Sequence, residues 1–299
     1  MSRTLSTIMF RTIRAGWRKC HPETAARLLA FVRSRLARPG GFADRHGQPD
    51  LYYTMFGLLV AAAADMPLNR NDTEHYLQSF APPALDLVHL AGLTRSRLLL
   101  QHLRRSPLAR LAAAAWPRQS LPPALHEAYN ALAAGAPERF PHRDPWSPYS
   151  QMLRWSLAED LGLNYVPQGL DQYRQADGMF ANLVGDAAPA VNATAAALML
   201  LNASGADRHA LRPDLQRLAA LQAPDGGFPA TPPAPVADLL STATASLALT
   251  CCQHPLPHSL KPFLRQTITP AGGFAAVPGD DTPDLEYTAY GLMAMGLTG

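Results

Sequence analysis

Two kinds of helical segment alternate along the chain, and they differ in how their hydrophobic positions are distributed. The stretches 194–201, 242–252 and 287–297 are apolar on almost every face, which is typical of helices that are buried on most sides. The stretches 22–36 and 208–221 mix charged with apolar positions, as helices do that cover a surface. We therefore expect buried inner helices that alternate with amphipathic outer helices.

A repeated turn precedes each clear inner helix. A Gly-Gly-Phe sequence, or Gly-Met-Phe in one copy, comes before a Thr, and the Phe-to-Thr interval is 12 residues in the first copy and 14 in the other three. In three copies an Asp stands four residues before the Thr, where its side chain can cap the free amides that begin a helix. The four pairs are Phe42 and Thr54, Phe180 and Thr194, Phe228 and Thr242, and Phe274 and Thr288.

The interval between copies predicts the number of units. Thr194, Thr242 and Thr288 lie 48 and 46 residues apart, and Thr54 lies 140 residues before Thr194, which is about three periods. Two degenerate units are therefore expected between 70 and 162, with one inner helix near Asp86 and another within 146–161. Together with clear repeats near 22–64, 166–202, 207–252 and 257–299, this pattern predicts an all-α protein of about six outer/inner helix pairs.

Six such pairs can close into a double-layered helical barrel with a central cavity. An open row of repeats would leave apolar faces at both ends without polar capping repeats. The chain is expected to begin with the outer helix 22–36 and to stop just after an inner helix, so that the first and last units can dock together. We predict a single closed domain over residues 1–299, whose cavity is lined by the starts of the inner helices.

Composition narrows the cellular setting of the chain. Only 16% of its 299 residues are charged and 47% are hydrophobic, which excludes disorder as the main state. No apolar run approaches the ~20 residues that span a bilayer, and the first residues lack a signal sequence, so a cytoplasmic location is expected. The three cysteines, Cys20, Cys251 and Cys252, lack the spacing of a zinc site.

Positive charge is concentrated near the beginning of the chain. The net charge is +3, but residues 1–50 hold ten Arg or Lys against three acidic residues. This basic segment is either an ordinary solvated helix face or a surface for a phosphate group, an anionic lipid surface or an acidic partner. Peripheral membrane contact through this segment is therefore an open alternative, whereas no partnership with nucleic acid is expected.

The Gly-Gly-Phe turn followed by Asp-Leu-x-x-Thr-Ala resembles the repeat of the terpenoid cyclase and protein prenyltransferase superfamily. The segment from Gln222 to Phe228 is also similar to the family's Q-x3-G-x-[W/F] element. The resemblance covers most of the chain and implies an α/α toroid that binds an isoprenoid or another long apolar substrate. Because the same toroid serves cyclases, prenyltransferases and non-catalytic binders, the resemblance specifies the fold more closely than the function.

The zinc ligands of the family's protein prenyltransferases are incomplete in this chain. In those enzymes one repeat supplies an Asp and a Cys two residues apart, and the next supplies a His just before the Thr-like position. Here Asp238 matches the Asp, but Leu240 replaces the Cys and Tyr287 replaces the His. A lone carboxylate does not hold zinc, so the resemblance predicts no zinc and no metal site of this kind.

The proton-donor motif of the family's cyclases is matched in part. Those enzymes carry D-x-D-D-T-A, in which an Asp protonates an alkene or an epoxide. Residues 284–289 match the first Asp, the Thr and the Ala, and they place Glu286 at the position of the proton donor. The resemblance implies that Glu286 is the catalytic acid, with Asp284 and Tyr287 in support. Alternatively, Asp284 is a helix cap and Glu286 a first-turn acid that the helix dipole favours.

Several side chains near the starts of inner helices are candidates for substrate binding. Aromatic rings lining a cavity can stabilise a carbocation through their π faces, or they can simply form core. The candidates are Tyr52, Tyr53, Phe56, Asp50, Asp238, Tyr149, Trp155 and Tyr290.

A second acidic motif precedes the last inner helix. Residues 280–284 spell D-D-x-x-D, the magnesium motif of ionising terpene synthases. Gly279 and Pro283 place these carboxylates in a loop rather than on one face of a helix, so they would bind magnesium only loosely. We expect no cofactor.

Two classes of function remain open. One is a terpenoid-cyclase-like isomerase or lyase that starts cyclisation with Glu286, with metal-independent prenyl transfer as a less favoured variant. The other is a non-catalytic toroid that binds a lipid, a peptide or a partner subunit, which the missing zinc ligands and the incomplete acid motif favour. Family cyclases usually place the site between two helical domains, so the cyclase function would need a partner subunit or a homodimer.

Overall fold

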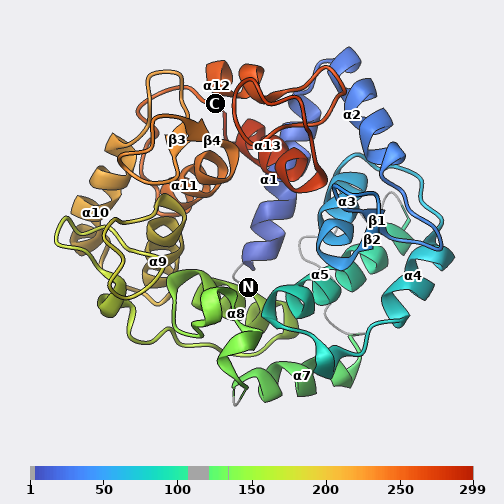
Figure 1. Cartoon of the computed structure of the whole chain (residues 1–299), viewed down its shortest axis with the longest axis horizontal. Helices are drawn as coiled ribbons and strands as arrows, with labels where there is room; N and C mark the ends of the chain where they lie inside the picture. Colours follow the sequence, from blue (N-terminus) through green and yellow to red (C-terminus); the bar gives the residue numbers. More distant parts are fainter. Residues whose placement is uncertain (1–3, 107–120, 134, 299) are drawn as a thin grey trace.

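The computed structural model describes residues 4–106, 121–133 and 135–298, and it has two concentric layers of helices around a central axis (Figure 1). Each inner helix packs against the next, and the last packs against the first, so the ring is closed. The predicted all-α toroid is thus confirmed. The inner helices are α3 (Leu51–Ala63), α5 (Leu87–Arg104), α8 (Pro148–Leu161), α9 (Val191–Ala203), α11 (Leu239–Cys251) and α13 (Leu285–Leu297).

The outer layer is less regular than the inner one. Before α9 the chain forms the short 3₁₀ turn η4 (Leu170–Tyr173) instead of an outer α-helix, because prolines and glycines interrupt the segment 162–190. Further 3₁₀ turns are η1 (Pro82–Ala84), η2 (Pro137–Arg139) and η3 (Pro141–Arg143). The outer α-helices are α2 (Pro22–Ser34), α4 (Arg70–Gln78), α7 (Pro123–Ala133), α10 (Arg208–Ala220) and α12 (Lys261–Thr267).

The two degenerate units lie where the repeat interval places them. The inner helix α5 begins directly after Asp86, and α8 falls inside the expected stretch 146–161. Residues 107–120 and 134, which belong to the same stretch of the sequence, lie outside the described residues.

A pair of hydrogen bonds explains the Phe-to-Thr interval. In each clear unit the buried Phe N–H donates to Oγ1 of the Thr, at 2.8 Å for Phe42 and Thr54 and at 2.8 Å for Phe228 and Thr242. The same Thr hydroxyl donates to the backbone carbonyl four residues earlier, as Thr242 does to Asp238 at 2.6 Å. We call this arrangement the Phe–Thr clasp. It satisfies a buried amide that the turn would otherwise leave unpaired. The other two clasps join Phe180 to Thr194 and Phe274 to Thr288.

The turn that carries the clasp needs glycine. In two units it is a small antiparallel hairpin, formed by β1 (Phe42–Ala43) with β2 (Pro49–Asp50) and by β3 (Phe228–Pro229) with β4 (Ala237–Asp238). Gly226 has a φ of +97°, and a Cβ there would lie 2.1 Å from the carbonyl oxygen of Ser259 in the next unit. Only glycine fits this conformation and this close approach.

The Gln222 side chain joins its unit to the next one. Its amide Nε2 donates to the carbonyl oxygens of Gly226 and His258, and its Oε1 accepts the N–H of His258 at 2.8 Å. The residue that the family resemblance singled out therefore has a structural role between two units.

The first helix, α1 (Leu5–Lys19), belongs to neither layer. It lies across the end of the ring at which the inner helices finish. Arg14 pairs with Asp65 just after α3, at 3.2 Å, and the ring of Phe10 contacts that of His102 near the end of α5, with centroids 5.1 Å apart. The expectation that the chain begins with an outer helix was therefore wrong, because one face of α1 is buried inside the toroid.

The contact between α1 and α13 is made backbone to backbone. A Cβ on Gly16 would lie 1.8 Å from the carbonyl oxygen of Leu292, and a Cβ on Gly296 would lie 2.0 Å from that of Thr12. Only glycines allow two helices to approach this closely. The C-terminal half of α1 therefore packs directly against the last turns of α13.

The basic segment near the beginning of the chain is divided between buried and exposed positions. Arg11 and Arg14 of α1 are half-buried, whereas Arg18 and Lys19 are exposed. Arg3 lies outside the described residues. In the described part of the chain, no helix combines the length and the apolar character needed to cross a membrane.

Candidate functional site

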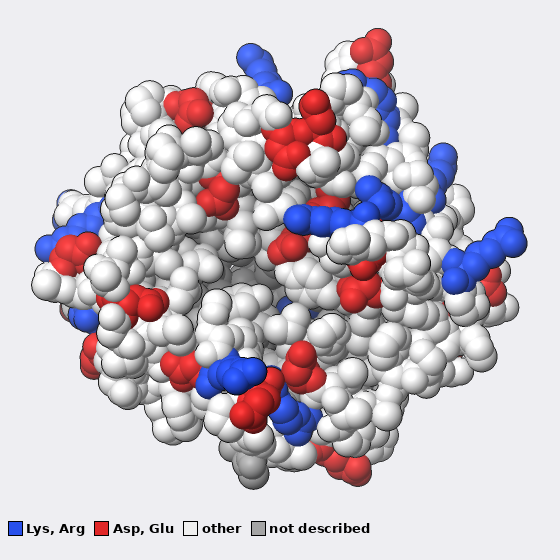
Figure 2. Space-filling model, viewed as in Figure 1, with Lys and Arg blue, Asp and Glu red and all other residues white. Residues whose placement is uncertain are grey.

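A cavity of about 270 Å³ lies on the axis of the ring, and all six of the inner helices named above contribute to it. On each helix the lining residues recur at intervals of three or four, which places them on one face. On α13 they are Glu286, Tyr290 and Met293. A hollow near the centre of the face drawn in Figure 2 marks the axis of the ring from outside. The cavity wall is mostly apolar, and besides its tyrosines the ionisable side chains among the described lining residues are Glu286, Arg95 and His142.

Glu286 lies in the first turn of α13 and faces the cavity. The phenol of Tyr52 on α3 donates a hydrogen bond to its Oε1 at 2.6 Å. Burial raises the pKa of Glu286, the neighbouring charge of Asp284 raises it further, and the Tyr52 hydrogen bond and Arg45 act in the opposite direction. The protonated form of this carboxyl is therefore more favoured than it would be in water, which suits a general acid.

Aromatic rings surround this carboxyl. The rings of Tyr52 and Phe56 meet edge to face with centroids 4.9 Å apart, and Phe56 and Tyr290 are 5.6 Å apart. Tyr149 of α8 lines the same cavity, and burial raises its pKa to about 12. Burial likewise raises the pKa of Tyr290 well above its ordinary value. These phenols are neutral at physiological pH, and their π faces can stabilise a cation.

Asp284 and Tyr287 lie beside the cavity rather than in its lining. Asp284 is only 2% exposed, and its Oδ1 accepts the backbone N–H of Tyr287 at 2.7 Å, so it is the N-cap of α13. Its Oδ2 pairs with Nε of Arg45 at 2.7 Å. The Arg45 guanidinium lies over the ring of Tyr287, 5.5 Å from its centroid. The structure thus brings only Glu286 of the three predicted catalytic residues to the cavity wall.

The predicted substrate-binding residues divide into two groups. Tyr52, Phe56, Tyr149 and Tyr290 line the cavity. Tyr53 and Trp155 do not: both are half-buried against the core, since a step of one residue turns a side chain by about 100° around a helix.

Asp50 and Asp238 are helix caps at the starts of α3 and α11. Asp50 accepts the backbone N–H of Tyr53 at 2.9 Å, and Asp238 accepts that of Ser241 at 2.8 Å. Burial raises the pKa of Asp238, and its Oδ2 has no hydrogen-bond partner among the described residues. Neither residue lines the cavity.

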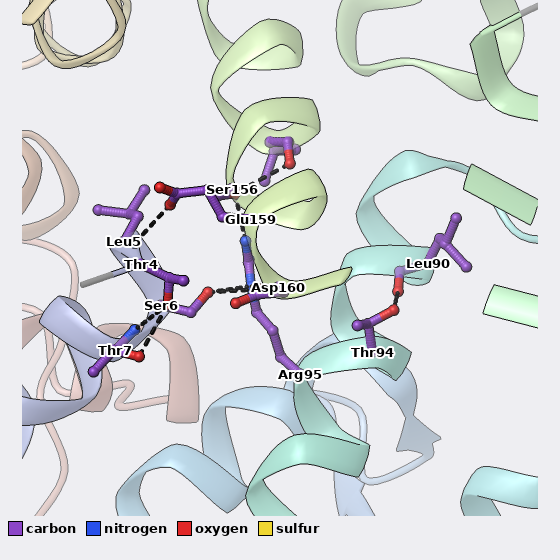
Figure 3. Close-up of polar contacts among 11 residues, drawn as sticks. Thr4, Leu5, Ser6, Thr7, Leu90, Thr94, Arg95, Ser156, Glu159 and Asp160 are labelled. Carbon is purple, nitrogen blue, oxygen red and sulfur yellow. Dashed lines mark hydrogen bonds and ion pairs between the residues drawn. The ribbon is translucent and has the colours of Figure 1, made fainter. Parts of the chain in front are cut away.

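Arg95 is a cavity residue that the sequence reasoning missed. It projects from α5, is 8% exposed, and its Nε contacts Oδ2 of Asp160 at 3.2 Å and Oγ of Ser6 at 3.0 Å. Ser6 donates to Asp160 at 2.7 Å, and Nη2 of Arg95 donates to Ser156 at 2.5 Å. Figure 3 shows these side chains converging from α1, α5 and α8. An arginine among the leucines of α5 is the sequence signal that could have identified it.

The acidic loop before α13 and the two adjacent cysteines do not form a reactive or metal-binding site. Asp280 accepts hydrogen bonds from Thr282 within its loop, and Asp284 caps α13. Burial raises the pKa of both Cys251 and Cys252 to about 11, so these thiols are unreactive at neutral pH. Within residues 4–106, 121–133 and 135–298, no group of three or more His, Cys, Asp or Glu side chains is arranged to hold a metal ion.

Comparisons with known proteins agree with this architecture. A family model described as the prenyltransferase alpha-alpha toroid domain matches residues 20–91 and 257–299, which contain the first and last units of the closed ring. Drimenyl diphosphate synthase from Streptantibioticus cattleyicolor is 33% identical over 117 residues, which cover 34% of this chain. The matched region spans only 21% of that protein, about a fifth of its length.

A solved structure is also similar over most of the chain. Protein geranylgeranyltransferase-I from Candida albicans, in complex with GGPP, aligns with 99% of this chain and 84% of its own, at 13% identity and a TM-score of 0.41. The family-model match, the curated relative and the closed ring of inner helices agree with the repeat in the sequence. The chain thus has an α/α toroid fold, and its first and last units are similar to the prenyltransferase alpha-alpha toroid domain.

Proposed function

We propose that this chain binds an isoprenoid in its central cavity and starts the cyclisation of that isoprenoid by protonation from Glu286. The observation that carries the proposal is the contact between Tyr52 and Glu286: a half-buried carboxyl with a raised pKa lies at the wall of an apolar, aromatic cavity. The similarity to drimenyl diphosphate synthase supports an isoprenoid diphosphate as the substrate class.

The proposed step is a proton transfer to an alkene. The Glu286 carboxyl gives its proton to one alkene carbon, the π electrons form the new C–H bond, and a carbocation remains on the neighbouring carbon. The Tyr52 phenol donates its hydrogen bond to the carboxylate that is left behind. The rings of Phe56 and Tyr290 would stabilise the cation until a later step returns a proton to the carboxylate.

Asp284 supports this step as a positioning residue. By capping α13 it fixes the first turn, in which Glu286 stands two residues later. Its negative charge also raises the pKa of Glu286, and the Arg45 ion pair holds Asp284 in place. In the acid motif, Glu286 therefore faces the cavity and Asp284 fixes the position of Glu286.

The test is the Glu286→Gln variant, compared with wild type and with the control Glu23→Gln in the exposed face of α2. The proteins are incubated with geranyl, farnesyl and geranylgeranyl diphosphate, and products and bound ligand are measured separately. We expect Glu286→Gln to retain binding and to lose turnover by about a hundredfold or more, because general-acid catalysis contributes roughly that much. Undiminished turnover in Glu286→Gln would refute the acid role.

The second candidate is a non-catalytic toroid that binds the same class of ligand, a peptide or a partner subunit. It is favoured by Asp284, whose carboxylate is committed to a helix cap and to Arg45, and by Tyr287, which is outside the cavity. Binding of an isoprenoid diphosphate by the wild type without any product, alone or with a partner, would select this candidate. In either case we propose that residues 1–299 act as one toroid domain.

A further inference from the structure

The two ends of the cavity are built differently. One end is surrounded by the starts of the inner helices, where Glu286 stands in the first turn of α13. At the other end the lining includes Leu5 and Met9 of α1. We propose that α1 is the floor of the cavity and that Leu5 and Met9 are specificity-determining residues that limit the length of the apolar chain admitted. This inference rests on the proposed binding of an isoprenoid.

The contacts of α1 locate it at the far end. Arg14 pairs with Asp65 just after α3, the backbone N–H of Leu5 donates to Glu159 in the last turn of α8 at 2.9 Å, and Lys19 bonds to the carbonyl oxygen of Gly296. Each of these partners lies at or near the C-terminal end of its inner helix. The helix α1 therefore crosses the ring opposite the ends at which the inner helices begin.

The depth between the acid and this floor is short. From Glu286 to Met293, the deepest lining residue of α13, the chain advances seven residues. At 1.5 Å per residue this is about 10 Å along the helix axis. An apolar chain with its reacting alkene beside Glu286 has about this distance before it meets α1. The side chains of Leu5 and Met9 therefore decide how many further carbons fit.

The floor is fixed at both of its ends. Near its N-terminal end, Ser6 donates to Asp160, which also contacts Arg95, so α1 is joined to α8 and α5 by a buried polar cluster (Figure 3). Toward its C-terminal end, Gly16 and Gly296 hold the backbones of α1 and α13 in contact. A longer ligand therefore cannot simply push α1 aside, and the room must come from its side chains.

The test measures the affinity of the full chain for geranyl, farnesyl and geranylgeranyl diphosphate by titration calorimetry. The variants are Met9→Ala and Leu5→Ala, which deepen the cavity, and Met9→Phe, which makes it shallower. The matched control is Ile8→Ala, because Ile8 is a half-buried residue of the same helix that does not line the cavity. Thermal melting confirms that each variant is folded. Because Met9→Ala enlarges the cavity and Met9→Phe makes it smaller, opposite shifts in length preference would show an effect of cavity depth rather than of lost stability.

We expect Met9→Ala and Leu5→Ala to raise the affinity for the longer ligands relative to the shorter ones by about tenfold, since each buried methylene contributes roughly fourfold. Met9→Phe should shift the ratio in the opposite direction, and Ile8→Ala should leave it unchanged. If the wild type binds these ligands and the ratio is the same in both Met9 variants, the floor assignment is wrong. If no variant binds any of them, the proposed function fails and the inference with it.

A shifted length preference without turnover would separate the two claims. It would support the floor and leave only the acid role of Glu286 in question, because binding in the cavity does not require protonation.

Discussion

The four units with a Phe–Thr clasp and the two units between residues 70 and 162 are held in different ways. In the clasped units one hydroxyl joins the turn to the inner helix through backbone groups, as Thr242 does with Phe228 and Asp238. The inner helices of the unclasped units, α5 and α8, are joined instead by the buried charges of Arg95 and Asp160. A hydrogen bond within each clasped unit thus contrasts with a side-chain ion pair that links the two unclasped units to each other.

The largest effect is expected where that charge pair is broken. Asp160→Ala leaves Arg95 buried without its carboxylate, and breaking a buried ion pair in this way costs about 3–5 kcal/mol. Arg95 and Asp160 are 8% and 2% exposed, so solvent does little to compensate for the loss. We expect the free energy of unfolding, measured by urea denaturation, to fall by that amount.

The matched double variant Arg95→Met with Asp160→Leu should recover most of this loss, because apolar side chains of similar volume can replace a buried pair. A loss below about 1 kcal/mol in Asp160→Ala would mean that the charge pair does not hold the unclasped units together.

A smaller effect is expected from the removal of one clasp. Thr242→Val keeps the shape of the side chain but removes the acceptor of the buried Phe228 N–H. An unsatisfied buried amide costs about 1–3 kcal/mol, which denaturant titration can resolve. Thr250→Val on the exposed face of the same helix is the control, and it should change stability by less than about 0.5 kcal/mol. Equal effects of the two variants would contradict the role assigned to the clasp.

The smallest effect is expected on the pH dependence of stability, because a clasped unit and an unclasped unit each place an ionisable side chain in the cavity in a different environment. Arg95 of α5 has a carboxylate partner, whereas Glu286 of α13 has the Tyr52 hydroxyl. Because the pKa of Glu286 is raised in the folded state, the folded chain holds this proton to higher pH than the unfolded chain does. Its contribution to stability is present below the unfolded pKa of about 4.3 and is lost as pH rises through the folded pKa.

The variant Glu286→Gln has no carboxyl at this position and should not lose stability in this way as pH rises. The difference in free energy of unfolding between Glu286→Gln and wild type is therefore expected to grow in favour of the variant as pH rises above about 4.3. A difference that does not change with pH would show that the carboxyl has its ordinary pKa in the folded chain. The measurement is a series of denaturant titrations across this pH range.

The ring itself could be predicted from the sequence because its signals are local and repeated. The Asp86 cap and the Phe–Thr intervals locate α5 and the clear inner helices to within a few residues. The helix α1 could not be assigned in the same way. It carries an amphipathic pattern like that of an outer helix, and only the closed ring provides the surface that its apolar face covers.

The site was harder to predict for a related reason. Inner helices are apolar on nearly all faces, so their sequence does not reveal which face meets the cavity; Tyr52 and Tyr53 were equally good candidates, and only Tyr52 lines it. The pairing of Arg95 with Asp160 joins residues 65 positions apart, which no local pattern connects. Glu286 was identified because a motif, rather than periodicity, singled it out.

The position of α1 also has a kinetic consequence. If α1 closes one end of the cavity as proposed, a bound molecule would enter and leave through the opposite end. A second molecule in solution would then have no route through the α1 end by which to displace the first. The rate at which a bound apolar chain dissociates should therefore be independent of the concentration of free competitor, and each exchange must pass through an empty cavity.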